Sequence, residues 1–116
     1  MKKLRLPLIL VCLIVVVSVK AQKIYSTNQE YQAQVKVFVV DQEYQADLLV
    51  YKVNQEYQAQ GNQGKWYFVE HEYQADVKIY FVNQEYQADL KVFFVRQEYQ
   101  AGWQKREKMH LLYGNK

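Results

Sequence analysis

Apolar and polar residues alternate along much of this chain with a period of two. In the unit spanning residues 83–95, five side chains share one face, namely Tyr86, Ala88, Leu90, Val92 and Phe94. This alternation is typical of a half-buried β-strand, and it recurs in residues 31–39 and 73–81. Glu, Gln and Ala favour helices, but each such stretch soon gives way to β-branched and aromatic residues. The pattern therefore predicts short strands.

The pentapeptide Gln-Glu-Tyr-Gln-Ala occurs five times, and a sixth copy at 71–75 begins with His71. The tyrosines of the six copies are spaced 13, 13, 16, 13 and 13 residues apart. Each unit is too small to bury an apolar face alone, so neighbouring units must stack. Because each tyrosine shares a face with Ala, Val and Leu, we expect the six rings to stack in the core, with glutamine amides bonding their hydroxyls. They are Tyr31, Tyr44, Tyr57, Tyr73, Tyr86 and Tyr99. The alternative is an exposed aromatic strip that binds glycans or peptides.

The repeat length constrains how the strands connect. An unbroken strand with a 13-residue repeat would exchange its two faces at every unit, so the register must be reset at each junction. Asn and Asp at most junctions suit this role, and a bend near the Ala-Asp pair would shorten each strand. The glycine-bearing insertion at 60–66 is the one loop expected inside the domain. We predict an all-β fold, a compact array of short repeated strands in two pseudo-symmetric halves of three repeats, with residues 102–116 as a cap or tail.

The first 21 residues resemble a processing signal. A positive head at residues 2–5 precedes an apolar run from Leu6 to Val19, and Val19-Lys20-Ala21 offers a cleavage site before Gln22. A membrane-spanning helix would need about 20 apolar residues, more than this run supplies. A lipid anchor at Cys12 is the other alternative, although Val11 stands where a small residue is expected. We therefore predict a cleaved signal peptide at 1–21, a single exported domain at 22–116 that is periplasmic or extracellular, and no membrane association after cleavage.

Removing the leader changes the charge of the chain. The full sequence has a net charge of +3, but its first 21 residues hold four basic residues and no acidic ones. The remainder carries 11 basic and 12 acidic residues, a net charge of −1. No basic patch is left to bind nucleic acid or an anionic membrane surface.

The repeated carboxylates raise the question of catalysis or metal binding. The six repeat glutamates, with Asp47, Asp76 and Asp89, could form glycosidase pairs or a calcium ring. Glycosidases need two carboxyl groups in unlike environments, whereas identical repeats predict like environments and pairing with nearby lysines. Ser26 and Thr27 offer no triad, and neither His71 nor His110 has metal-ligand spacing. We expect no catalysis, no cofactor and no metal.

The two tryptophans break the repetition. Trp66 follows the insertion and Trp103 follows the last repeat, and unique residues in loops often carry function. They are the predicted binding site for a cell-envelope glycan or a protein partner whose identity is unknown. An outer-membrane barrel and a secreted amyloid are rival architectures. The short repeat leaves little room for barrel loops, and the charges in every unit oppose a dry zipper.

Repeats such as Gln-Glu-Tyr-Gln-Ala-Asp-Leu-Lys-Val-Phe-Phe-Val, at 84–95, resemble those of the bacterial septoil-knot domain family. The resemblance extends from about Lys23 to Tyr113. It implies a small β-rich fold whose backbone traces a deep, seven-crossing knot as a doubly wound torus, and it carries over no functional residues. The leading hypothesis is therefore an exported, non-enzymatic structural domain of unknown molecular function that resists unfolding. The alternative is the binding module at Trp66 and Trp103.

Overall fold

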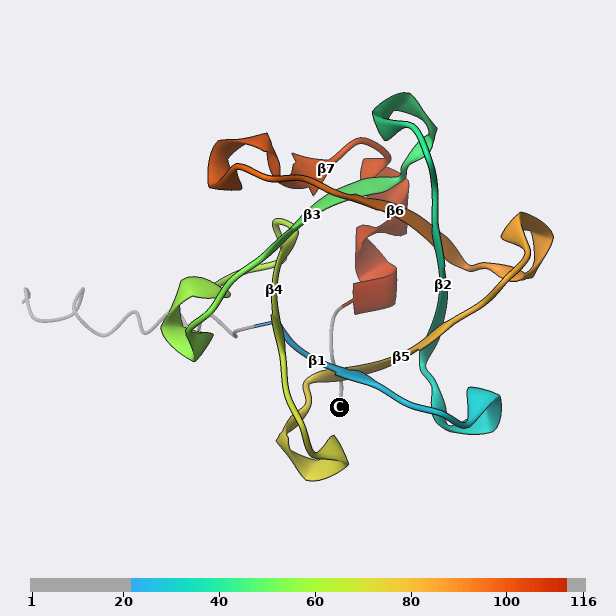
Figure 1. Ribbon diagram of the computed structural model, residues 1–116, viewed down its shortest axis with the longest axis vertical. Coiled ribbons are helices and arrows are strands. Elements are labelled where there is room, and N and C mark those ends of the chain that lie inside the picture. The colour runs from blue at the N-terminus through green and yellow to red at the C-terminus, as the bar shows by residue number, and fades with distance from the viewer. Residues whose placement is uncertain (1–21, 113–116) are drawn as a thin grey trace, which may run out of the picture.

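The computed structural model describes residues 22–112, so the predicted signal peptide at 1–21 lies outside the described residues. Six short parallel strands close into a barrel (Figure 1). Its strands are β1 (Lys23–Ser26), β2 (Val35–Val39), β3 (Leu48–Lys52), β4 (Lys65–Phe68), β5 (Val77–Phe81) and β6 (Leu90–Phe94). Their order is β4-β1-β5-β2-β6-β3, and pairing of β3 with β4 closes the ring. The predicted all-β array of short repeated strands is confirmed.

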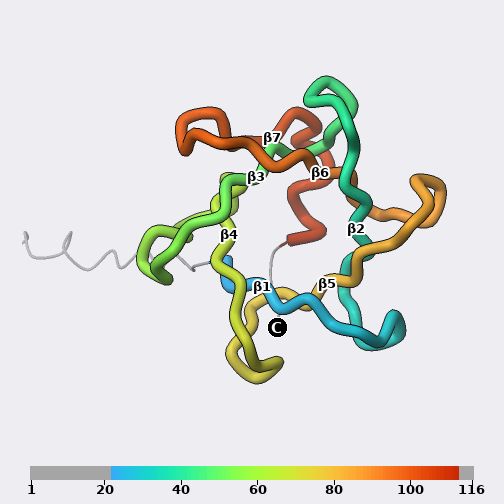
Figure 2. The backbone as a smooth tube through the Cα atoms, in the orientation of Figure 1, coloured from blue at the N-terminus to red at the C-terminus, as the bar shows by residue number. Residues whose placement is uncertain are grey.

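The chain passes round this barrel twice (Figure 2). Strands β1, β2 and β3 take alternate positions in the first turn, and β4, β5 and β6 fill the gaps between them in the second. Ile24 of β1 pairs with Val77 of β5, for example, and Leu48 of β3 pairs with Val92 of β6. The two predicted halves of three repeats are thus interleaved, and each strand of one half packs between strands of the other.

The step from β3 to β4 differs from the other connections. Every other connection passes over one intervening strand, whereas β4 lies directly beside β3. The insertion at 60–64 makes this short step, with Gly61 and Gly64 at φ of 77° and 88°. Without the offset, a fourth strand would arrive at the position that β1 already occupies. The insertion therefore lets the second turn interleave with the first.

The tyrosine pentapeptides form the corners between strands. Each contains a single turn of 3₁₀ helix, as follows: η1 (Glu30–Gln32), η2 (Glu43–Gln45), η3 (Glu56–Gln58), η4 (Glu72–Gln74), η5 (Glu85–Gln87) and η6 (Glu98–Gln100). In every copy the alanine N–H donates to the glutamate carbonyl at 3.0 or 3.1 Å. At η3 the second glutamine also caps the turn, because Gln58 Oε1 accepts from the N–H of Gln55 at 3.0 Å.

The prediction that these tyrosines stack in the core is wrong. Their exposed fractions run from 70% at Tyr57 to 84% at Tyr73 and Tyr99. The alternation does predict the strands, but each strand begins only after the alanine, since the chain must first reverse its course in the corner. Local hydrogen bonds within the pentapeptide make that turn, and the tyrosine side chain is left outside. The register is thus reset by the whole corner and not by its Asn or Asp junction alone.

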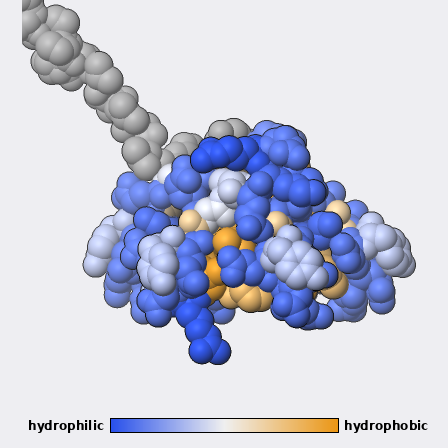
Figure 3. All heavy atoms as spheres, turned by 90° about the horizontal axis from the view of Figure 1, so that it is seen from above, coloured by the Kyte–Doolittle hydropathy of each residue, from blue (hydrophilic) through white to orange (hydrophobic). Residues whose placement is uncertain are grey.

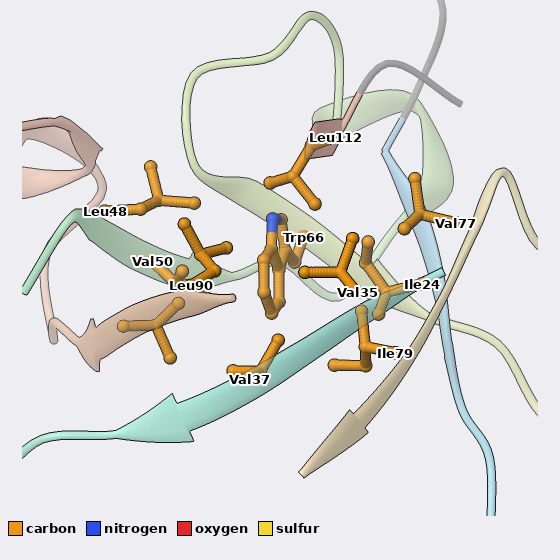
Figure 4. Close-up of a cluster of buried hydrophobic side chains, with 11 residues drawn as sticks. Ile24, Val35, Val37, Leu48, Val50, Trp66, Val77, Ile79, Leu90 and Leu112 are labelled. Carbon is orange, nitrogen blue, oxygen red and sulfur yellow. The ribbon is translucent and has the colours of Figure 1, made fainter. Parts of the chain in front are cut away.

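The core is a single column of inward-facing side chains inside the barrel. Trp66 is fully buried at its centre, and its ring meets the edges of Phe68 and Phe94 at centroid distances of 5.9 and 6.4 Å. Figure 4 shows the indole surrounded by aliphatic side chains from the other strands. They include Ile24, Val35, Val37, Leu48, Val50, Val77, Ile79, Leu90 and Val92. These residues fall on the alternate strand positions that the sequence pattern marks as apolar.

The end of the described chain closes the barrel. Strand β7 (Gly102–Trp103) pairs antiparallel with β3, and η7 (Arg106–Leu112) then lies across the ring (Figure 1). Leu112 is fully buried in the core, and its carbonyl accepts from Gln22 Nε2 at 3.0 Å. The Met109 carbonyl accepts from Asn62 Nδ2 at 3.0 Å. Both partners precede a strand, so η7 covers the end of the barrel where the parallel strands begin.

Candidate functional site

The two tryptophans that the sequence predicts as a binding site both make contacts within the fold. Lys65 and Trp66 belong to β4, and Trp66 has no exposed surface with which to meet a ligand. Its inward position matches that of Ile79 in β5, so it contributes to the core and not to a loop. Trp103 is half-buried, and its Nε1 donates to the carbonyl and side-chain oxygens of Asn62 at 2.9 and 3.2 Å. The structure therefore contradicts a binding role for Trp66 and shows Trp103 joining β7 to the insertion.

The repeated aspartates join the two turns of the chain. Asp47 Oδ2 accepts from the N–H of Lys91 at 2.9 Å, and the Asp47 N–H donates to the Lys91 carbonyl at 2.7 Å. Three other positions make the same double link to a lysine of a neighbouring strand: Asp76 to Lys23, Asp89 to Lys36 and Gln34 to Lys78. The partners are 44 or 53 residues apart in the sequence. These carboxylates therefore bind backbone N–H groups of the barrel itself.

The repeated glutamates form ion pairs with lysines on the outer face of the strands. Five such pairs have N–O distances from 2.8 to 3.4 Å, namely Lys23–Glu56, Lys36–Glu30, Lys65–Glu98, Lys78–Glu72 and Lys91–Glu85. Glu43 is the exception, because Leu49 stands at the lysine position and is buried beneath β7. The predicted charge pairing of glutamates with strand lysines is thus observed.

Asp47 has a second contact that its equivalents lack. It is fully buried, and Lys108 Nζ of η7 lies 3.2 Å from its Oδ2. Its Oδ1 has no hydrogen-bond partner among the described residues. A buried carboxylate is costly unless it is paired, so this contact ties the closing helix to the barrel wall. Between residues 22 and 112, no group of His, Cys, Asp or Glu side chains is arranged to hold a metal ion.

Shallow polar hollows lie beside several corners. One of about 540 Å³ is lined by Lys23, Glu56, Tyr67, His71 and Tyr73 among others. A second, of about 710 Å³, contains Glu30, Tyr31, Lys36 and Tyr80, and a third, of about 560 Å³, contains Glu85, Tyr86 and Lys91. Each hollow therefore combines one Glu–Lys ion pair with a corner tyrosine. The sequence offers an exposed tyrosine surface only as the alternative, because the period-two pattern favours placing the tyrosines inside.

The wall of the barrel and its corners define a class of protein: a closed, doubly wound parallel barrel built from repeats, whose repeated polar groups bond to one another. A family model described as 7(1) septoil knot domain matches residues 21–104. The chain belongs to this family, which confirms the resemblance of its repeats. Neither a curated protein nor a solved structure matches the chain. No helix within residues 22–112 is long and apolar enough to cross a membrane.

Proposed function

We propose that this protein is an exported, non-catalytic structural domain whose function depends on its persistence outside the cytoplasm. The observation that carries the proposal is the interleaving of the two turns. Each barrel strand of one half is hydrogen-bonded on both sides to strands of the other half. Local unfolding of one repeat therefore exposes the edges of two distant strands.

The use of polar side chains supports a structural role. The repeated Asp, Glu and Lys residues bind backbone or one another, as described above, and the chain after residue 21 has no cysteine to form a disulfide. Persistence must then come from the winding, the buried core and the closing helix. Pairing over 44 to 53 residues makes folding slow, because loop closure must precede the contacts that reward it.

We also propose that the backbone path is knotted, as the description of the family implies. Two interleaved turns closed by a terminal helix are the arrangement that a torus-type knot requires. Such a knot is untied only when one end of the chain threads back through the barrel, a step separate from the loss of native contacts.

The unfolding rate in denaturant tests the proposal. We expect the chain from residue 22 onward to unfold more slowly than about 10⁻⁶ s⁻¹ at 25 °C, the slow limit of ordinary small domains. The buried Trp66 supplies the fluorescence signal. A matched control carries a protease site inserted next to the exposed Gln63, so that cleavage separates the two turns without altering a strand or corner. Unfolding within minutes, or equal rates before and after cleavage, would contradict the proposal.

Export has its own measurement. Mass spectrometry of protein recovered from the periplasm or medium is expected to give a mature chain beginning at Gln22. Retention of the intact leader on cytoplasmic protein would refute export while leaving the structural role to the unfolding experiment.

A further inference from the structure

The corner tyrosines contribute nothing visible to the stability of the domain. The other residues of the corner have structural contacts: the glutamate pairs with lysine, the second glutamine caps the turn and the alanine N–H closes it. The tyrosine rings instead lie 70–84% exposed. Among the described residues, only Tyr73 has an aromatic neighbour, His71, stacked at a centroid distance of 5.4 Å. Fold stability therefore does not explain why tyrosine occupies this position in all six copies.

Variation between the repeats points to the same position. The tetrapeptide Glu-Tyr-Gln-Ala is unchanged in six copies, whereas the strands that follow exchange Val, Leu and Ile inside and Lys and Leu outside. Those strand positions vary even though they build the core and the wall. The tyrosine is therefore constant at a position where packing does not require it.

The surroundings of the tyrosines define the chemistry of that molecule. In the hollow at η1, the Glu30–Lys36 ion pair lies with Tyr31 and with Tyr80 of a neighbouring strand. A carboxylate, an ammonium group and glutamine amides donate to and accept from hydroxyl groups. The aromatic ring has a partly negative face, on which the C–H groups of a pyranose ring can stack. One aromatic face beside several hydrogen-bonding groups fits a sugar ring.

The distribution of the corners favours a polymer of sugars over a protein. A stable protein interface buries about 800 Å² on each partner around an apolar centre. Here the six corners stand apart around the ring (Figure 1), and each carries an exposed tyrosine with Glu before it and Gln after it in the sequence. Figure 3 shows that the apolar surface on that face lies between the polar corners, not on them. Identical sites repeated round a rim suit a ligand that is itself repetitive.

We propose that the six tyrosine corners bind polysaccharide, with each corner holding one sugar residue. A single exposed aromatic contact binds weakly, with a dissociation constant on the order of 1 mM. Two or more corners on one polymer or mesh raise the overall affinity by about 10²- to 10⁴-fold through effective concentration. Because the rim faces outward in all directions, separate glycan strands can be held by opposite corners of one molecule. This role goes beyond the persistence proposed above and stands or falls on a different measurement.

The test is retention of the chain from residue 22 onward on three insoluble glycans: cellulose, chitin and purified peptidoglycan. We expect retention by at least one of them at micromolar protein. A single Tyr86→Ala change should weaken binding less than about tenfold, and Tyr→Ala at all six corners should weaken it by about 10²-fold or more. Tyr→Phe at all six corners keeps the stacking face, so retention should stay within about threefold. Val39→Ala, which alters an exposed apolar residue away from the corners, is the matched control and should change nothing.

Several outcomes would overturn the inference. No retention of the wild-type chain on any of the three glycans refutes it, as does equal retention of the six-fold Ala variant. Concentration-dependent dimers in sedimentation, lost in that variant and accompanied by no glycan retention, would assign the corners to a second copy of the chain. Circular dichroism checks that the variants fold, and the single Ala variants keep the test valid if the six-fold variant does not.

Discussion

Alanine substitutions at Gly64 and Gly61 distinguish two costs in the insertion that offsets the second turn: left-handed backbone strain and steric overlap with neighbouring strands. Both glycines have positive φ, 88° and 77°, so a change to alanine costs each of them about 1–2 kcal/mol of left-handed strain. Their surroundings differ. A Cβ at Gly64 would lie 2.4 Å from the Leu49 carbonyl oxygen and 3.1 Å from the Gly102 nitrogen, whereas at Gly61 the nearest atom, Gln63 Cγ, is 3.9 Å away. The difference in stability between the two variants therefore measures the cost of placing a side chain where the insertion approaches β3 and β7.

Relief of the contact at Gly64 requires a backbone shift, because both near atoms belong to the main chain. Overpacking of this kind costs about 1–3 kcal/mol beyond the strain. We expect Gly61→Ala to lower the free energy of unfolding by about 1–2 kcal/mol. Gly64→Ala should lower it by roughly 2–5 kcal/mol when the strain and the contact are added. Guanidinium denaturation followed by Trp66 fluorescence, after long equilibration, gives the two values. Equal losses, within about 0.5 kcal/mol, would refute the argument that this glycine is needed where the ring closes.

Three further changes test the contacts that join the repeats. Asp47→Ala leaves the Lys91 N–H without its acceptor and the Lys108 ammonium with the Asp89 carbonyl alone, and it should cost about 2–4 kcal/mol in chemical denaturation. Asp89→Ala removes the equivalent hydrogen bond, from the Lys36 N–H to an exposed carboxylate, and should cost about 1 kcal/mol. Similar losses for the two variants would show that the buried Asp47–Lys108 contact adds no stability. Leu49→Lys restores a partner for Glu43, but an exposed ion pair is worth about 0–1 kcal/mol and the lost burial about 1.5–3, so stability should fall. A rise in the denaturation midpoint of Leu49→Lys would show that the ion pair contributes more than the burial of Leu49. Stability in 0.5 M NaCl should stay within about 1 kcal/mol of its low-salt value, since every Glu–Lys pair of the repeats is partly exposed and weak. A larger salt effect, measured by the same denaturation curves, would assign the ion pairs a greater share of stability.

The strands could be predicted from the sequence because their pattern is local. Leu90, Val92 and Phe94 alternate with polar or partly exposed residues, and that alternation alone marks β6 and its inward face. The division into two halves also follows from a local signal, the glycine-bearing insertion. The order of strands round the barrel could not be derived in this way. It depends on pairs such as Ile24 with Val77, whose distance in sequence leaves no local trace.

The tyrosine corners show where period-two reasoning fails. Tyr86 and Ala88 continue the alternation of β6, so the pattern extends the strand backwards through a segment that is a 3₁₀ turn. Glu, Tyr and Gln in that segment are residues that helices accept, and in other copies, such as that of Gln58, a capping glutamine is a further sign of a turn. Trp66 fails for the opposite reason. It looks like a loop residue because the insertion precedes it, yet it is the second residue of β4 and fills the centre of the barrel.

Whether a repeat position is constant or variable depends on whether its contacts lie within one repeat or between distant repeats. A corner is completed by bonds within its own pentapeptide, such as that from Ala88 N–H to the Glu85 carbonyl, so six copies can be the same. The interior is shared by all six strands and by Leu112, and six identical side chains would leave its centre either empty or overfilled. One position must then hold something much larger, and Trp66 supplies it where β4 begins the second turn. The inward positions therefore diverge because they meet one another, while the corners can stay alike because each is completed by its own hydrogen bonds.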